Sequence, residues 1–271
     1  MKIFSKIFLL SAVVALAVVG CKDPDDPKPD PENPSTHSDW PSTPPECDAF
    51  TDQIVDGGFE TQWYQPQDAE YLEYKSSVFY TLNSLITLKD IPAMQVVQAP
   101  ITAQLDSVTP HGGNYAIKLV TGSLVNAANG RLLVPGAIAP LNQTFVNEFL
   151  NSPDGINVKR PYTQKPIAIS GYFKYESVNG DSASVCVELY DADKQVIARG
   201  YHLQKNSVNT WTQFNVPIDY TVSGGSMESA VPAYISIIIS ASAGYDFSEL
   251  TNCRGQDGSA LWIDDLELHF R

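Results

Sequence analysis

Alternating apolar and polar residues, broken by turn residues at intervals of about ten, recur along the chain from Thr51 onward. A period of two places the apolar side chains of a strand on one face. Turn signals such as Asn179-Gly180-Asp181 and Gly224-Gly225 fall between the runs. The runs span residues 115–120, 167–176, 185–189, 196–203, 211–218, 234–240 and 260–270. This pattern predicts an all-β protein, an antiparallel β-sandwich of the jelly-roll type formed by residues 50–271 as a single domain.

The N-terminus has the features of an export signal. Lys2 and Lys6 flank the start of the apolar run Ile7–Val19, which is well short of the roughly 20 residues that span a bilayer. Gly20 precedes Cys21, and this ending resembles a bacterial lipobox, in which the cysteine is diacylated and becomes the mature N-terminus. We therefore expect residues 1–20 to be a lipoprotein signal peptide and Cys21 to carry the lipid. The alternatives are a transmembrane anchor, which the short run disfavours, and cleavage elsewhere, which the placement of Cys21 disfavours.

Residues 21–49 are predicted to be a disordered linker that begins at the lipidated Cys21. Between Lys22 and Glu46 the chain has eight prolines and seven acidic residues, so it has too little apolar surface to fold. The acidic residues directly after Cys21 resemble the export tags of surface-exposed lipoproteins in glycan-scavenging bacteria; a plain charged spacer is the alternative. We expect an outer-membrane protein that faces the cell surface and touches the membrane through its lipid alone.

The charge and the cysteines narrow the class of protein further. A formal net charge of −14 argues against nucleic acid as a partner, because phosphate contacts need Lys and Arg, and it favours divalent cations. Cys47, Cys186 and Cys253 leave at least one thiol unpaired. Cys186 is expected to be a packed free thiol. A Cys47–Cys253 bridge is possible, but spacing alone does not decide it.

Two motifs at the ends of the domain carry a family resemblance. Asp-Gly-Gly-Phe-Glu at 56–60 and Ser-Ala-Leu-Trp-Ile-Asp-Asp-Leu-Glu-Leu at 259–268 resemble the first and last strands of jelly-roll carbohydrate-binding modules. Between them lie the motifs at 111–119, 135–136 and 171–175. In this order the motifs resemble the family named "putative carbohydrate metabolism domain" (PCMD), found in envelope lipoproteins of glycan-degrading bacteria. The resemblance implies a galactose-binding-like sandwich and a role near carbohydrate, without naming a reaction.

The best candidate for a metal site involves Glu60 and Asp264. In the last run Asp264 shares its parity with Leu266 and Leu268, so the carboxylate is expected to face inward, where it needs a partner or a metal. In the modules that the chain resembles, the Glu of the opening motif and an Asp of the closing motif bind a structural calcium. Calcium takes 6–8 oxygens, so main-chain carbonyls would complete the shell. The alternative is a β-bulge that turns Asp264 outward and Asp265 inward.

A glycan surface needs aromatic rings, because the C–H faces of sugars stack on them. We expect Tyr64, Tyr71, Tyr74 and Tyr80 to provide such rings, with Asn83 as a partner for sugar hydroxyls. The alternative is that these tyrosines belong to the sandwich core.

Three tryptophans are assigned separately. Trp63 and Trp262 are expected in the core, whereas Trp211 is a further option for ligand contact.

These observations favour a surface lipoprotein with a non-catalytic carbohydrate-binding sandwich. Its expected partners are an oligo- or polysaccharide and neighbouring glycan-uptake proteins. A glycoside hydrolase is the first alternative; it requires two carboxylates about 5–5.5 or 6.5–9.5 Å apart. The cluster Asp68–Glu73 is the candidate for such a pair, with Asp68 and Glu70 on one strand face, and a solvated edge is the alternative reading of this cluster. A structural or adhesive envelope subunit is the second. No catalytic residue is assigned.

Overall fold

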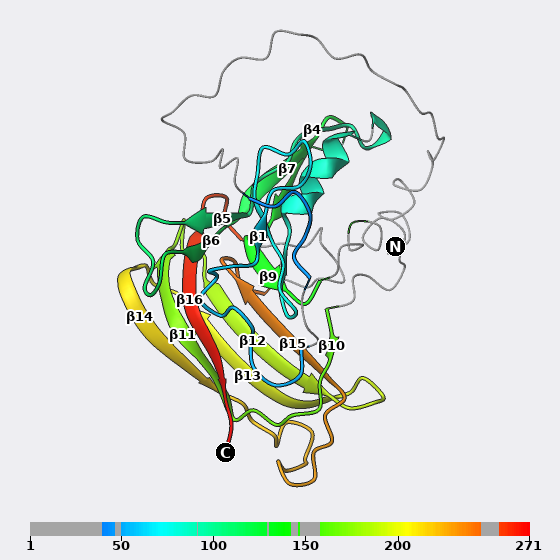
Figure 1. The fold of residues 1–271 in the computed structure, drawn as a ribbon, viewed down its shortest axis with the longest axis vertical. Coiled ribbons are helices and arrows are strands. Elements are labelled where there is room, and N and C mark those ends of the chain that lie inside the picture. Colours follow the sequence, from blue (N-terminus) through cyan, green and yellow to red (C-terminus); the bar gives the residue numbers. More distant parts are fainter. Residues whose placement is uncertain are drawn as a thin grey trace.

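Two antiparallel sheets form the main body of the molecule (Figure 1). The computed structural model describes residues 40–46, 50–90, 92–128, 130–141, 146, 158–244 and 255–271. The five-stranded sheet has the order β14-β11-β16-β6-β5, and the six-stranded sheet has the order β13-β12-β15-β9-β3, with β10 paired to β15. The architecture confirms the predicted antiparallel β-sandwich of the jelly-roll type.

The strand bounds are as follows. The five-stranded sheet contains β5 (Ala103–Asp106), β6 (Ala116–Val120), β11 (Ala168–Glu176), β14 (Val208–Pro217) and β16 (Ala260–His269). The six-stranded sheet contains β3 (Tyr80–Thr81), β9 (Ala137–Ala139), β10 (Arg160–Pro161), β12 (Ala183–Tyr190), β13 (Val196–Gln204) and β15 (Tyr234–Ser240).

Alternation builds the core between the two sheets, as the sequence predicts. On β11, Ile169, Phe173 and Tyr175 are buried, while Tyr172 and Lys174 between them are only half-buried on the other face. On β12 the apolar set of Val185, Val187 and Leu189 is buried against them. Each such side chain contributes roughly 1.5–3 kcal/mol when it leaves water. The period of two therefore fixes which residues face the core and which face outward.

A β-bulge in β16 changes the expected parity of the last strand. Ser170 pairs with Glu267 and Tyr172 pairs with Asp264, so two residues of β16 oppose Gly171 alone. Asp265, within the bulge, has φ 51°. Leu261 and Ile263 face the core before the bulge, and Leu266 and Leu268 face it after. The expectation that Trp262 lies in the core is therefore wrong, because the bulge places Trp262 and Leu266 on opposite faces although they share their parity in the sequence.

A second, smaller core lies beside the sandwich. It is built from the sheet β4-β7-β8 and the 3-10 helix η1 (Asn83–Asp90), which the sequence did not predict. Tyr80, Leu85 and Leu124 are among its buried residues. The remaining short elements are β1 (Trp63–Tyr64), β2 (Glu73–Tyr74), β4 (Val96–Gln98), β7 (Gly122–Asn126), β8 (Gly130–Val134) and η2 (Pro92–Met94).

Part of the predicted linker packs on the folded domain. The Trp40 ring lies 5.8 Å from the ring of Tyr115, and the Gln65 amide donates to the Pro41 carbonyl at 2.9 Å. The large apolar surface of Trp40 explains why this otherwise proline-rich stretch is held. The folded part thus includes residues 40–46, ahead of the predicted boundary at residue 50.

Several predictions fall on residues outside the described ranges. These are the signal peptide 1–20, the lipidated Cys21 and the Cys47–Cys253 pair, which stay predictions. In the part of the chain that is described, no helix is long and apolar enough to cross a membrane. Cys186 is a half-buried free thiol.

Candidate functional site

The two end motifs of the domain meet in space. The Leu266 amide of β16 donates to the Gly57 carbonyl at 2.9 Å, and a Cβ on Gly57 would overlap the Leu266 carbonyl oxygen. Asp56 holds the turn that follows: its carboxylate accepts the amide of Glu60 at 2.7 Å and that of Gln62 at 3.1 Å. Glycine at position 57 therefore lets the opening motif lie directly on the last strand.

Asp264 is fully buried beneath the loop that connects β5 and β6. Its Oδ2 accepts the main-chain amides of His111 at 2.8 Å and Gly112 at 3.2 Å, and its Oδ1 accepts the amide of Asp265 at 2.9 Å. Burial raises the pKa of Asp264 to about 6, although these amide donors lower it. Strand alternation places Asp264 on the same face as Trp262, opposite Ile263, so the bulge and the covering loop account for its burial.

Glu60 binds the same loop from the other side. Its Oε1 accepts the amides of Asn114 at 2.9 Å and Tyr115 at 3.0 Å. A Cβ on Gly58 would lie 3.8 Å from Asp264 Oδ1, 3.8 Å from Glu60 Cγ and 3.5 Å from Asp265 Oδ1. The structure thus brings the two predicted metal ligands to one place.

The donor set at this junction matches calcium chemistry. Carboxylate oxygens are hard ligands, but Asp264 Oδ2 and both carboxylate oxygens of Glu60 each accept two N–H bonds already, whereas Asp264 Oδ1 accepts one and keeps a lone pair. Within the described residues, no group of three or more His, Cys, Asp or Glu is arranged to hold a metal. A bound calcium would therefore also need main-chain carbonyl oxygens. The calcium site stays a prediction.

The five residues predicted to contact a glycan lie in the interior. Tyr64, Tyr71, Tyr74, Tyr80 and Asn83 are all at most 9% exposed. The hydroxyls of Tyr64 and Tyr80 bond each other at 2.9 Å, and the Asn83 side chain bonds the main chain of Thr102 and Ala103. The expected exposed platform is thus not what the structure shows, because Tyr74 lies in the main core and Tyr80 in the second core.

A carboxyl group lies buried among these tyrosines. Glu73 is fully buried, its Oε1 accepts a hydrogen bond from Thr81, and its Oε2 has no partner in the described residues. Burial raises the pKa of Glu73 well above its ordinary value, although the bond from Thr81 lowers it. Because the pKa of Glu73 is higher in the folded state than in the unfolded state, Glu73 favours the folded state most at low pH. This contribution to stability is lost as pH rises through the folded-state pKa.

We expect Glu73→Gln to raise the melting temperature at pH 8 relative to the wild type and to leave it nearly unchanged at pH 5. The amide cannot ionise, so it avoids the cost of a buried charge. Thermal unfolding followed by circular dichroism across this pH range measures the effect. Glu70→Gln, at an exposed position of the preceding turn, is the control and should change neither value. An equal melting temperature for Glu73→Gln and wild type at both pH values would contradict the assignment.

The acidic pair considered for hydrolysis lies on the surface. Asp68 and Glu70 are exposed in the turn before β2, and Asp68 has a left-handed φ of 59°. Asp68 and Glu70 therefore lie in a solvent-exposed turn, as the alternative of a solvated edge predicts.

A row of outward-facing side chains crosses the five-stranded sheet. Lys118 is the cross-strand partner of Gln104 on one side and of Trp262 on the other. Trp262 is in turn the cross-strand partner of Lys174. The ammonium of Lys174 lies 4.6 Å from the ring centroid of Trp211. None of the five is buried. We call Gln104, Lys118, Trp262, Lys174 and Trp211 the outer row. With strands about 4.8 Å apart, it is about 19 Å long.

The loop between β5 and β6 holds one end of the outer row in place. Lys174 donates to the Thr109 hydroxyl at 2.6 Å, and the Trp211 indole donates to the Thr109 carbonyl at 2.8 Å. The His111 ring stacks on Tyr172 with centroids 3.5 Å apart and meets Trp211 edge-on at 5.9 Å. The carboxylates of Asp264 and Glu60, which bind this loop, therefore also support the aromatic surface.

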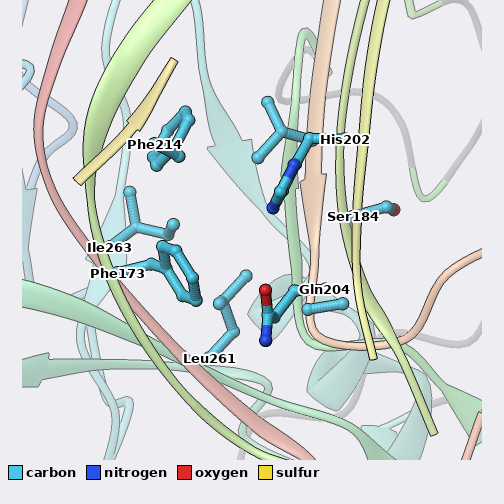
Figure 2. A pocket seen from close by; sticks show the side chains of 9 residues that line it. Phe173, Ser184, His202, Gln204, Phe214, Leu261 and Ile263 are labelled. Carbon is cyan, nitrogen blue, oxygen red and sulfur yellow. The ribbon is translucent and has the colours of Figure 1, made fainter. Parts of the chain in front are cut away.

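A small hollow between the sheets is too small to hold a sugar. Phe173, Phe214 and Ile263 line it from one sheet and His202 from the other, and Figure 2 shows these side chains turned toward one another. It has room for about one water molecule. The Nε2 of His202 is buried there without a hydrogen-bond partner in the described residues. The hollow is therefore a gap in the core.

Comparison with known proteins identifies the fold. No family model and no curated protein matches the chain. A "putative glycoside hydrolase" from Bacteroides thetaiotaomicron VPI-5482 has a crystal structure that aligns with TM-score 0.58 and 16% identity, over 83% of this chain and 72% of that one. Another, from Bacteroides vulgatus ATCC 8482, aligns with TM-score 0.54 and 14% identity, over 83% and 100%. Identities this low establish a shared fold.

Proposed function

We propose that this protein is a non-catalytic carbohydrate-binding lipoprotein of the outer membrane that uses the outer row as its glycan surface. The observation that carries the proposal is the pair of half-exposed rings, Trp211 and Trp262, on one face of the five-stranded sheet. The ammonium of Lys174 lies 4.6 Å from the ring centroid of Trp211 and 5.2 Å from that of Trp262. Indole rings offer apolar faces to sugar C–H groups, and Gln104 and Lys118 offer hydrogen bonds to hydroxyls.

Three further points support this role. The order of the sequence motifs resembles the PCMD family of envelope lipoproteins, and the lipobox resemblance at Cys21 predicts membrane attachment. The two solved structures with the same fold are each named "putative glycoside hydrolase", and this supports carbohydrate as the ligand class. The function is capture of oligo- or polysaccharide at the cell surface for neighbouring uptake proteins, with affinity gained by several copies acting together.

A glycan array probed with the purified full chain, read together with release of reducing sugar, tests the proposal. Binding without sugar release supports it. Sugar release that is lost in Glu70→Gln or Asp68→Asn would instead support the hydrolase, and the absence of any bound glycan would favour the adhesive subunit. The surface lipoprotein assignment is tested separately by acyl labelling of wild type and Cys21→Ser.

We also infer that a structural calcium stabilises the junction of Glu60, Asp264 and the loop between β5 and β6. The carboxylates of Asp264 and Asp265 and the side chain of Glu60 lie near Gly58, and no Lys or Arg forms an ion pair with Glu60 or Asp264 in the described residues. Calcium at about 1 mM is expected to raise the melting temperature at pH 7.5 more than at pH 5, where Asp264 is largely protonated. Magnesium should act less, because it prefers a smaller octahedral shell.

Glu60→Gln is the matched variant, and it should remove the response to calcium. A melting temperature that is identical in calcium and in EGTA would show that the amide donors alone hold the loop.

A further inference from the structure

The outer row carries two positive charges beside one aromatic ring. The ammonium of Lys118 lies 4.6 Å and that of Lys174 lies 5.2 Å from the centroid of the Trp262 ring. Each lysine is the direct cross-strand neighbour of Trp262, one from β6 and one from β11. The chain as a whole has 17 basic against 31 acidic residues. Two lysines beside one ring are therefore a local concentration of positive charge on an acidic protein.

The two lysines differ in how their charge is balanced. Lys174 has Asp106 at 4.0 Å and donates to Thr109, so its ammonium is partly compensated. Lys118 forms no ion pair within the described ranges, and its strand neighbours Gln104 and Trp262 are uncharged. Like charges held close together disfavour each other, and an anion placed between them relieves the repulsion. The pKa of Lys174 is lowered, first by burial and further by the charge of Lys118, although Asp106 and Glu176 raise it.

We propose that the outer row binds an acidic saccharide, whose anionic group is held by Lys118 and Lys174 while its sugar ring stacks on a tryptophan. This inference rests on the proposed function and names its ligand class. The anionic group is a uronate carboxylate or a sulfate ester, since both accept hydrogen bonds from an ammonium. The net charge of −14 repels such a ligand at long range, and salt at physiological strength screens this repulsion beyond about 8 Å, so recognition depends on the local contacts.

Matched polymers separate the two anionic groups from neutral sugar. The purified full chain is tested by affinity electrophoresis against polygalacturonate and its methyl ester, and against dextran sulfate and dextran. We expect one charged polymer to bind at least about tenfold more tightly than its neutral partner, because hydrogen bonds to charged groups are the stronger class. Whichever pair shows the difference identifies carboxylate or sulfate.

The variants assign the effect to the outer row. Lys118→Met keeps an unbranched side chain over Trp262 but removes the charge, so it should abolish the preference for the charged polymer; Lys118→Arg should retain it. Lys205→Met, at an exposed site in the β13–β14 turn, is the control for general charge and should bind like the wild type.

The failures of the two proposals can be told apart. Equal binding of charged and neutral polymers, or a preference that survives in Lys118→Met, overturns the acidic ligand while the carbohydrate-binding function stands. If neither these four polymers nor any glycan of the array is bound, both proposals fall. A preference lost equally in Lys205→Met shows nonspecific charge attraction and also overturns the acidic site.

Discussion

Alanine in place of Gly57 is expected to lower the melting temperature by at least about 10 °C or to prevent folding altogether. The added Cβ would overlap the carbonyl oxygen of Leu266 and lie 3.0 Å from its carbonyl carbon. Both atoms belong to the main chain of a central strand, so neither can move without breaking pairs of β16. Steric overlap of this kind costs several kcal/mol, and about 1 kcal/mol corresponds to about 2–4 °C in a domain of this size. Differential scanning calorimetry measures the shift.

Gly225→Ala is the matched control for this prediction. A Cβ at Gly225 would meet no atom closer than 3.7 Å, so the same chemical change should leave the melting temperature within about 2 °C of wild type. A Gly57→Ala protein that melts with the wild type would mean that the opening motif does not lie on β16 as described.

Trp262→Ala is expected to weaken glycan binding by at least about tenfold, measured by isothermal titration calorimetry with a glycan identified on the array. The ring is the central member of the outer row, between Lys118 and Lys174, and its removal takes away both the stacking face and the partner of the two ammonium groups. Because the side chain faces away from the core, the protein should still fold, with a modest loss of stability.

Tyr201→Ala controls for the loss of an exposed ring elsewhere. Tyr201 is 52% exposed on β13, in the other sheet, so its removal should leave glycan binding unchanged. Full binding by Trp262→Ala, or an equal loss in Tyr201→Ala, would locate the ligand elsewhere on the sandwich.

The fold could be predicted from the sequence because its signals are local. Alternation along 167–176 and 185–189 identifies the core faces of β11 and β12, and glycines mark the turns. The burial of Asp264 was also predicted, but for the wrong reason. Parity counting assumes a regular strand, whereas the left-handed Asp265 inserts a bulge that changes the face of every later residue.

The candidate glycan surface could not be predicted because it depends on cross-strand register. Gln104, Lys118, Lys174, Trp211 and Trp262 come from five strands spread over more than 150 positions of the chain, and no local pattern connects them. The exposure expected for the tyrosines between positions 64 and 80 is wrong for the opposite reason. They cluster in sequence, but the sequence does not show that the chain folds Tyr74 into the main core and Tyr80 into the second core.

The position of the last strand has a consequence for folding. β16 lies between β11 and β6, in the middle of its sheet, although it follows all the other described strands in the sequence. The centre of this sheet therefore consists of pairs between segments far apart in the chain, such as Trp262 of β16 with Lys118 of β6. Pairs of this kind require a long loop to close before any contact forms, so we expect the centre of the five-stranded sheet to form late in folding.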